Sequence, residues 1–281
     1  MFSSINEFDI NRNGVSSNQD FISLIDLLTQ IRDFLSELGY LTFGRDMSVF
    51  RQTGAVNGNM ILDSATRTME SIRFCCMNAN FADAYSLLRK YRDDLFYYVY
   101  FFTVADNSDF TQYVDVQQLN EDEKNIWDWV HNQQNDLHIG SVLKCIASHP
   151  SARKAVKDFQ LKDSFDKLAD KLNNYVHSNG YRFYNESYNR LDEKNKIKEE
   201  CKEFGEAAIF ITISFLFLVV LIKPLLIMSS DYTDYLDVGD TPPDGSQYWV
   251  APFVSDFLST HKNVLDDRCD SYLREKTGMQ I

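Results

Sequence analysis

AAIFITISFLFLVVLI, residues 207–222, is the most apolar stretch of this 281-residue chain. It carries no charge, and only one threonine and one serine in it are polar. After Lys223 and Pro224 the apolar sequence resumes as LLIM, so residues 207–228 reach the length of about 20 residues that a membrane-spanning helix needs. A helix that is hydrophobic on every side equally fits the centre of a large helical bundle. The first interpretation predicts a membrane protein, and the second predicts a helical bundle with a buried central helix.

The sequence beyond this stretch favours a core helix. We expect one helix and a loop in residues 229–281. This segment carries many large apolar side chains, and so short a piece cannot bury them alone. The simplest partner is the N-terminal part of the chain, on the same side of any membrane. We therefore expect an all-α helical bundle with a fully apolar central helix at 207–222. The alternative is a span over 207–228, with the N-terminal part cytoplasmic because bases precede the span and acids follow it.

Helical periodicity dominates the rest of the chain, and we expect one domain over residues 1–281 with about seven or eight helices. The core is predicted to consist of residues 58–103, 161–177 and 200–228. Residues 40–57 are predicted to be a connector. Helices are predicted at residues 19–38, 58–79, 81–103, 139–148, 161–177 and about 252–276, with a short one inside 105–135. Gly39 is predicted to end the first of them. Two further helices are predicted to begin at Pro150 and at Asn185, and the second of these continues into the apolar stretch.

Composition and charge narrow the function classes. The formal charge is −13, from 41 acidic and 28 basic residues, so an acidic surface makes DNA an unlikely partner and disfavours RNA unless one face is locally basic. The five cysteines form no CxxC pair, which indicates reduced, mostly buried thiols. The N-terminus lacks the features of a cleaved signal peptide. We expect a cytoplasmic protein, or an inner-membrane protein if residues 207–228 span the bilayer.

Motifs for cofactors and metals are absent from the sequence. There is no Walker, HExxH or GxSxG pattern. His131 and His138 lie near Asp136, but a loop this polar is more typical of solvated side chains than of a metal site. We therefore predict no cofactor and no metal.

The most suggestive chemistry lies in KLNNYVHSNG, residues 171–180. The predicted helix ends at His177, and Asn174 lies three residues earlier, on the same face. A protonated histidine at a helix C-terminus is stabilised by the helix dipole, which suits a group that donates a proton.

This segment resembles the HEPN superfamily, all-α domains of bacterial toxins, defence systems and RNA-processing enzymes, whose motif is an arginine and a histidine separated by four to six residues, near a helix end. His177 matches the histidine, whereas Lys171 stands where arginine is expected. The resemblance implies metal-independent RNA cleavage, with His177 in proton transfer, a cation stabilising the phosphorane, Asn174 as an orienting group, and a homodimer. Lysine supplies the charge without the bidentate fork of arginine.

A second helix could supply the missing guanidinium. Arg89 and Arg92 lie three residues apart on the predicted helix 81–103, and either could reach His177. The alternative is that they pair with Asp93, Asp94 or Glu70 at the edge of the bundle.

Three function hypotheses remain open. The first is a HEPN-like protein of a bacterial defence or toxin-type system, either an endoribonuclease or an inactive regulatory relative. The second is a membrane-associated effector anchored by residues 207–228. The third is a non-enzymatic helical scaffold that binds another protein. The predicted partners are accordingly RNA, a second copy of the chain, another protein, or a membrane.

Overall fold

The computed structural model describes residues 17–109, 114–133, 137–180, 183 and 194–281, which are 73% helical with eleven α-helices and one two-stranded hairpin. The expected all-α fold is confirmed. The helices are α2 (Gln19–Thr42), α3 (Asn59–Met77), α4 (Phe81–Asn107), α5 (Glu121–Val130), α6 (Ile139–Ser148), α7 (Pro150–Asp158), α8 (Leu161–Val176), α10 (Lys194–Ile222), α11 (Asp231–Asp237), α12 (Pro252–Thr260) and α13 (Cys269–Thr277). Three short 3-10 helices cover Val116–Gln118, Pro224–Ile227 and Ser246–Tyr248, and the hairpin consists of β1 (Met47–Phe50) and β2 (Gly54–Asn57).

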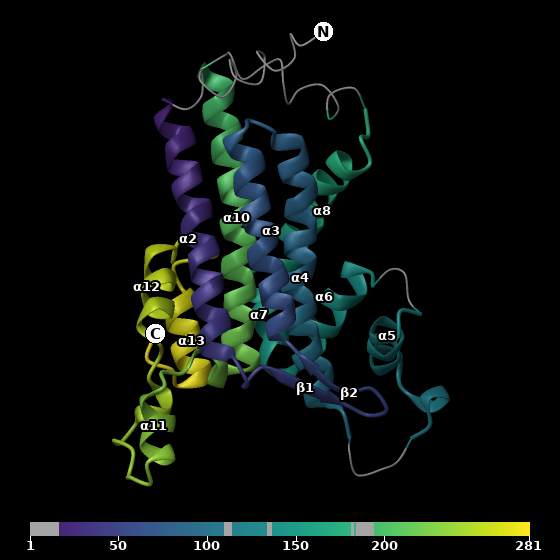
Figure 1. Cartoon of the computed structure of the whole chain (residues 1–281), viewed down its shortest axis with the longest axis vertical. Coiled ribbons are helices and arrows are strands. Elements are labelled where there is room, and N and C mark those ends of the chain that lie inside the picture. The colour runs from purple at the N-terminus through teal and green to yellow at the C-terminus, as the bar shows by residue number, and fades with distance from the viewer. Residues whose placement is uncertain (1–16, 110–113, 134–136, 181–182, 184–193) are drawn as a thin grey trace.

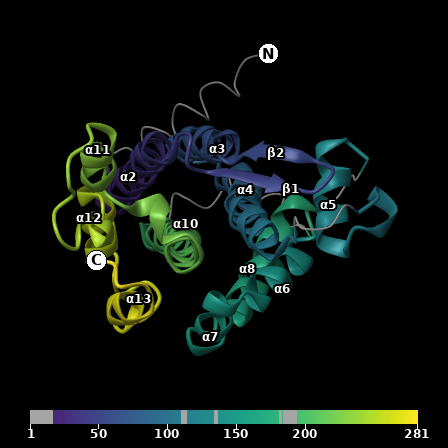
Figure 2. The ribbon, with the colours of Figure 1, turned by 90° about the horizontal axis from the view of Figure 1, so that it is seen from below.

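The long helices α2, α3, α4 and α10 run beside one another and form the body of the molecule (Figure 1). α10 packs against α2, α4, α7 and α13. Seen from below, α2 and α3 lie on one side of the bundle and α6, α7 and α8 lie on another (Figure 2). The C-terminal helices α12 and α13 close the bundle beside α2 and α10.

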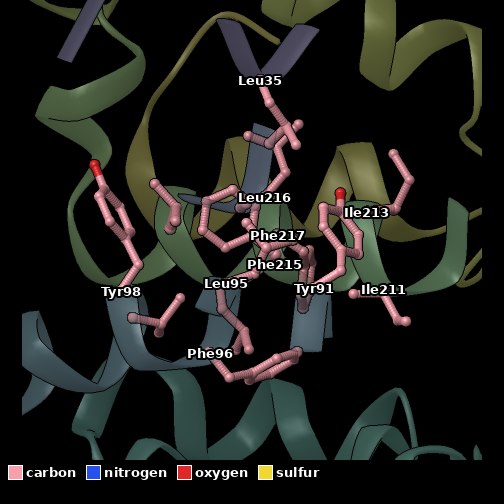
Figure 3. Packing of buried hydrophobic residues seen from close by; sticks show 14 of the residues in the cluster. Leu35, Tyr91, Leu95, Phe96, Tyr98, Ile211, Ile213, Phe215, Leu216 and Phe217 are labelled. Carbon is pink, nitrogen blue, oxygen red and sulfur yellow. The ribbon is translucent and has the colours of Figure 1, made fainter. Parts of the chain in front are cut away.

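α10 is the apolar centre of the fold. Residues 211–222 of this helix are at most 7% exposed, and in the most apolar 18-residue window of Ile197–Ile222 83% of the residues are buried inside the protein. Leu35 from α2 and Tyr91, Leu95 and Phe96 from α4 surround its side chains (Figure 3). By length and composition alone, Ile197–Ile222 could also cross a membrane.

The two polar side chains of the apolar stretch differ in how they are accommodated. Thr212 donates to the carbonyl oxygen of Ala208 at 2.8 Å, and its Oγ1 lies 2.8 Å from the hydroxyl of Tyr91 in α4. Thr212 and Tyr91 are both fully buried, so this bond joins α10 to α4 at the centre of the core. The hydroxyl of Ser214 is buried with no hydrogen-bond partner.

The end of α10 follows from local chemistry. Pro224 has no N–H to donate, and it disfavours helical backbone at Lys223, whose φ is −136° and ψ is 66°. Lys223 Nζ then lies 2.5 Å from Asp106 at the end of α4. Asp106 also faces His149, at 3.9 Å, where α6 and α7 meet. Burial lowers the pKa of His149, the Asp106 carboxylate opposes this shift, and Lys223 adds to it. The side chain of His149 caps α7 by accepting from the Ser151 N–H.

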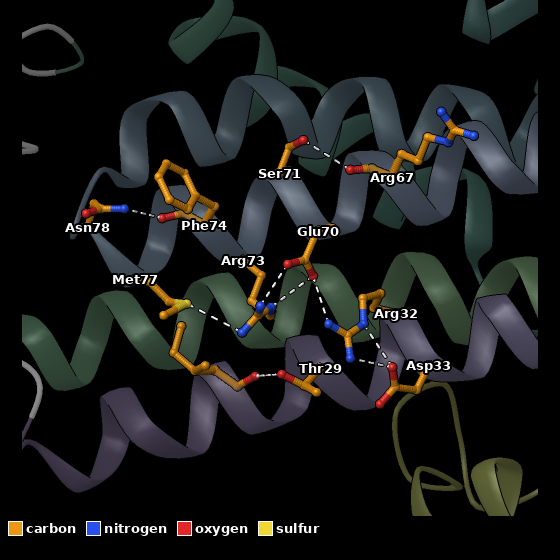
Figure 4. Close-up of polar contacts among 11 residues, drawn as sticks. Thr29, Arg32, Asp33, Arg67, Glu70, Ser71, Arg73, Phe74, Met77 and Asn78 are labelled. Carbon is orange, nitrogen blue, oxygen red and sulfur yellow. Dashed lines mark hydrogen bonds and ion pairs between the residues drawn. The ribbon is translucent and has the colours of Figure 1, made fainter.

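An ion-pair cluster joins α2 to α3 on the outside of the bundle (Figure 4). Glu70 accepts from Arg73 at 2.7 Å and from Arg32 of α2 at 2.9 Å. Hydrogen bonds from Arg73 and then Arg32 outweigh the desolvation of Glu70 and lower its pKa to about 2. The Glu70 side chain is 45% exposed, so solvent screening keeps the contribution of this cluster to stability small, on the order of 1 kcal/mol.

The predicted connector at 40–57 was wrong, because residues 47–57 form the β-hairpin. Ser48 and Phe50 point inward and Met47 and Val49 outward, an alternation too short to stand out in the sequence. Phe50 packs edge-on against Phe101 of α4, at 5.9 Å between ring centroids.

The turn of this hairpin is tied to α5 by a buried ion pair. Arg51 donates to both carboxylate oxygens of Glu123, at 2.8 and 2.6 Å, and Glu123 is only 1% exposed. Desolvation would raise the pKa of Glu123, but hydrogen bonds from Arg51 and Ser108 outweigh it, so the pKa is lowered. The charged form of Glu123 is therefore the one that the folded state favours.

Two predicted helix ends also differ from the structure. α2 continues past Gly39 to Thr42, and the Gly39 carbonyl additionally accepts from the Asn59 side chain of α3 at 2.7 Å. The predicted helix 252–276 is two helices, because α12 stops at Thr260 and α13 begins at Cys269. Between them, Asp266 accepts hydrogen bonds from the backbone N–H and the guanidinium of Arg268, which favours a turn there. Asn185, the predicted start of the central helix, lies outside the described residues.

Candidate functional site

The structure ends α8 at Val176 and makes His177 its C-cap, as the sequence predicts. The His177 side chain is exposed, and its backbone N–H donates to the Asn173 carbonyl at 3.0 Å. Asn174 lies in the same last turn, where its side-chain oxygen accepts from the Asn179 amide at 3.2 Å. Asn174 is thus occupied by the turn that follows α8, whereas the imidazole points to the surface.

Lys171 is held by two partners instead of standing free beside His177. Its ammonium lies 2.6 Å from the Glu203 carboxylate of α10 and 2.9 Å from the Tyr85 hydroxyl of α4. It also sits 4.6 Å from the centre of the Tyr85 ring. Glu203 neutralises the charge, and the contacts join α8, α10 and α4, which gives Lys171 a clear structural role.

The two arginines of α4 are directed to an acid of their own helix. Arg92 is 2% exposed and donates to Asp93 at 2.7 and 2.9 Å, while Arg89 lies 3.9 Å from the same carboxylate. The alternative pairing considered from the sequence is confirmed for Asp93. Burial raises the pKa of Asp93, and the charges of Arg92 and Arg89 oppose that shift.

The packing of α4 on α8 sets how far these groups lie from His177. Tyr85 stacks on Tyr175 at 4.3 Å and Phe96 meets Phe165 at 4.6 Å, so the two helices are antiparallel. Arg92 is seven residues from Tyr85, about 10 Å along α4 and away from the His177 end of α8. The structure brings Lys171 to Tyr85 and Glu203, and it does not bring Arg92 to His177.

The described residues contain no group of three or more His, Cys, Asp or Glu side chains that could hold a metal ion. His131 stacks on Trp127, and its Nδ1 lies 2.7 Å from the Trp127 carbonyl oxygen. All five cysteines are free, and burial raises the pKa of each thiol, so they are protonated at neutral pH and are poor nucleophiles.

A surface that sequence reasoning missed lies where α2 ends and α3 begins. Tyr40, Phe43 and Met60 are 82%, 72% and 73% exposed, and we call these three side chains the corner patch. Tyr40 and Phe43 line a groove of about 260 Å³ between α2 and α3, together with Asn59, the neighbour of Met60. The only signal for this surface in the sequence was that these three apolar residues depart from the spacing of a helical apolar stripe.

The fold and its surfaces define the class of the protein as an all-α bundle built around a buried apolar helix. Lys171, Arg89 and Arg92 are engaged in contacts between and within helices, whereas the His177 side chain is exposed. No family model, no curated protein and no solved structure matches the chain.

Proposed function

We propose that the chain is a non-enzymatic helical module that binds another protein through the corner patch of Tyr40, Phe43 and Met60. The observation that carries this proposal is their exposure, more than 70% for each, at one corner of the bundle, where Tyr40 and Phe43 line a groove and Met60 follows the groove residue Asn59. Five of the thirteen exposed large apolar side chains in the described part of the chain fall within residues 40–60. Clustered apolar surface of this kind is typical of protein-binding sites, whereas scattered single side chains are not.

The negative charge of the protein favours a partner with a basic binding segment. The chain carries a formal charge of −13, and Asp63 lines the groove beside the corner patch. Asp63 pairs with Arg67 at 2.9 Å, but both side chains are more than half exposed, so this pair is weak. A partner segment with large apolar side chains flanked by lysine or arginine complements both features.

A photocrosslinking amino acid placed at position 40, 43 or 60 tests this proposal. We expect the same partner to be labelled from all three positions and not from Phe74, an equally apolar and 67% exposed residue of α3. Replacing Tyr40, Phe43 and Met60 by serine should abolish capture of that partner. The matched control replaces Phe74, Leu236 and Val238, three other exposed apolar residues, and should leave capture intact. Equal labelling from position 74, or capture that survives the corner-patch variant, would refute the proposal.

Metal-independent RNA cleavage by a HEPN-like site is the second candidate. It is favoured by the exposed His177, which follows shortly after residues 139–171, a segment with seven basic and four acidic residues in an otherwise acidic chain. RNA cleavage that persists in EDTA and disappears in His177→Ala would support it. Full activity in that variant would exclude it. Light scattering of the same samples tests the homodimer that the resemblance implies.

The burial of α10 supports a protein that stays in the cytoplasm over one anchored by residues 207–228. A lipid-facing helix exposes its apolar side chains, whereas 83% of the most apolar window of Ile197–Ile222 is covered by protein. We expect carbonate washing to leave the protein in the soluble fraction. Retention in washed membranes would instead favour the membrane-anchored alternative.

A further inference from the structure

A second surface feature, separate from the corner patch, lies between α6, α7 and α8. It is a cavity of about 440 Å³, within the range of about 300–1,000 Å³ typical of ligand sites. Phe96 from α4, Phe165 from α8 and Leu218 from α10 lie beneath it and are almost fully buried, and its accessible apolar floor consists of the half-buried Leu143, Ala147 and Val156. A guest that fills this space therefore meets mainly aliphatic side chains.

The mouth of the cavity is basic. Lys144 of α6, Arg153 of α7 and Lys162 of α8 line the cavity and are exposed. Asp166 is the one acid in the lining, and it pairs with Lys162 at 2.8 Å. Arg153 donates to the Ser148 carbonyl at 3.0 Å and keeps its positive charge. Two positive charges, those of Lys144 and Arg153, are thus left at the mouth without a carboxylate partner in the part of the chain that the structure describes.

This basic mouth is exceptional for the chain. Residues 139–171, which span α6, α7 and α8, contain seven lysines and arginines against four acids, although the whole chain has a formal charge of −13. Three of these seven bases, Lys144, Arg153 and Lys162, line the cavity, against the one acid Asp166. Repulsion by the rest of the surface disfavours large polyanions more than small ones, because a small anion contacts only the mouth.

We propose that this cavity binds a single-chain amphipathic anion, a fatty carboxylate whose hydrocarbon tail lies on Leu143, Ala147 and Val156 and whose carboxylate meets Lys144 and Arg153. Tail burial provides the affinity, and the cations orient the head group at the mouth. A nucleic-acid backbone would use the cations but would leave the apolar floor empty, so the apolar lining favours the fatty carboxylate.

Calorimetric titration with hexanoate, octanoate and decanoate, all below their micelle concentrations, tests the tail. Each buried methylene should tighten binding about fourfold, so decanoate should bind roughly 15 times more tightly than octanoate. Octan-1-ol, which lacks the charge, should bind more weakly than octanoate. Absence of decanoate binding, affinity independent of chain length, or equal binding of the alcohol would overturn the proposal.

Two substitutions locate the site. Ala147→Phe places a ring inside the cavity and should abolish decanoate binding. Its matched control is Ala207→Phe, which places the same ring in a different cavity of about 690 Å³ between α8, α10 and the end of α12. Decanoate binding that survives in Ala147→Phe and is lost in Ala207→Phe would assign the ligand to the other cavity and overturn the inference.

Gly140→Phe is a second blocking variant, because a Cβ at this rim position meets no atom within 4 Å and the fold should tolerate the ring. It keeps the test valid should Ala147→Phe fail to fold, as judged by circular dichroism. Lys144→Glu should weaken decanoate about fivefold, whereas Lys124→Glu on α5 makes the same charge change away from the cavity and should alter binding less than twofold. Equal weakening by both lysine variants would show that the ligand carboxylate does not contact Lys144 and would overturn the head-group assignment.

Discussion

The hydrogen bond between Tyr91 and Thr212 offers a sharp test of how α10 is packed. The two hydroxyl oxygens lie 2.8 Å apart, and both residues are completely buried. Tyr91→Phe removes the bond but leaves Thr212 donating to the Ala208 carbonyl, so no polar group is orphaned. This change should destabilise the fold by about 1 kcal/mol. Thr212→Val instead leaves the Tyr91 hydroxyl buried without a partner, which should cost about 2 kcal/mol.

The double variant Tyr91→Phe/Thr212→Val removes both polar groups and keeps the shapes of the side chains. Replacing both partners of a buried hydrogen bond by apolar groups is nearly neutral, so the double variant should cost less than Thr212→Val alone. The expected coupling between the two substitutions is therefore about 2 kcal/mol. Two unrelated residues, 121 positions apart in the chain, would show none.

Urea unfolding followed by circular dichroism at 222 nm, in buffer without detergent, measures this coupling. Thr212→Val should have the lowest urea midpoint. The midpoints of Tyr91→Phe and of the double variant should both lie above it. Costs that add within about 0.5 kcal/mol would refute the packing of α10 on α4. A wild-type protein that stays dispersed only in detergent would refute the burial of α10 altogether.

Three further predictions concern the hairpin and its surroundings. Arg51→Ala leaves the carboxylate of Glu123 buried without its counter-charge and should cost about 3 kcal/mol in urea unfolding, whereas a cost below 1 kcal/mol would contradict the buried pair. Burial raises the pKa of Asp46, so its ionisation opposes folding progressively as pH rises above the unfolded value of about 4. The melting temperature of Asp46→Asn should thus rise relative to that of the wild type as the pH is raised from 4 to 7. A difference in melting temperature that does not change with pH would argue against it. Gly58→Ala places a Cβ 2.7 Å from the Asp46 carbonyl oxygen and should cost about 2 kcal/mol, while Gly140→Ala, with open space around its Cβ, should be neutral or stabilising in the same melts.

The helical fold could be predicted from the sequence because its signals are local. The apolar stretch at 207–222 favoured a helix buried on all sides, and Pro150 marked the start of α7. The hairpin could not be predicted in the same way. Its strands are four residues long, and the Arg51–Glu123 pair that holds its turn joins positions 72 residues apart.

The candidate site was less accessible to sequence reasoning, because pairing across helices decides what a charged side chain can do. The position of His177 at the end of α8 followed from periodicity and the SNG turn. That Lys171 would meet Glu203, 32 residues away, had no signature in the sequence. The cavity between α6, α7 and α8 was equally hidden, since it exists only once five helices are assembled.

The position of α10 in the chain bears on how the protein is made. α2 ends at residue 42, but the helix that covers its apolar face is complete only at residue 222. At about 5–20 residues per second, a ribosome takes roughly 10 to 40 seconds to synthesise that interval. Throughout it, the nascent helices present uncovered aromatic and aliphatic side chains, so holding chaperones should engage this polypeptide before its last quarter emerges.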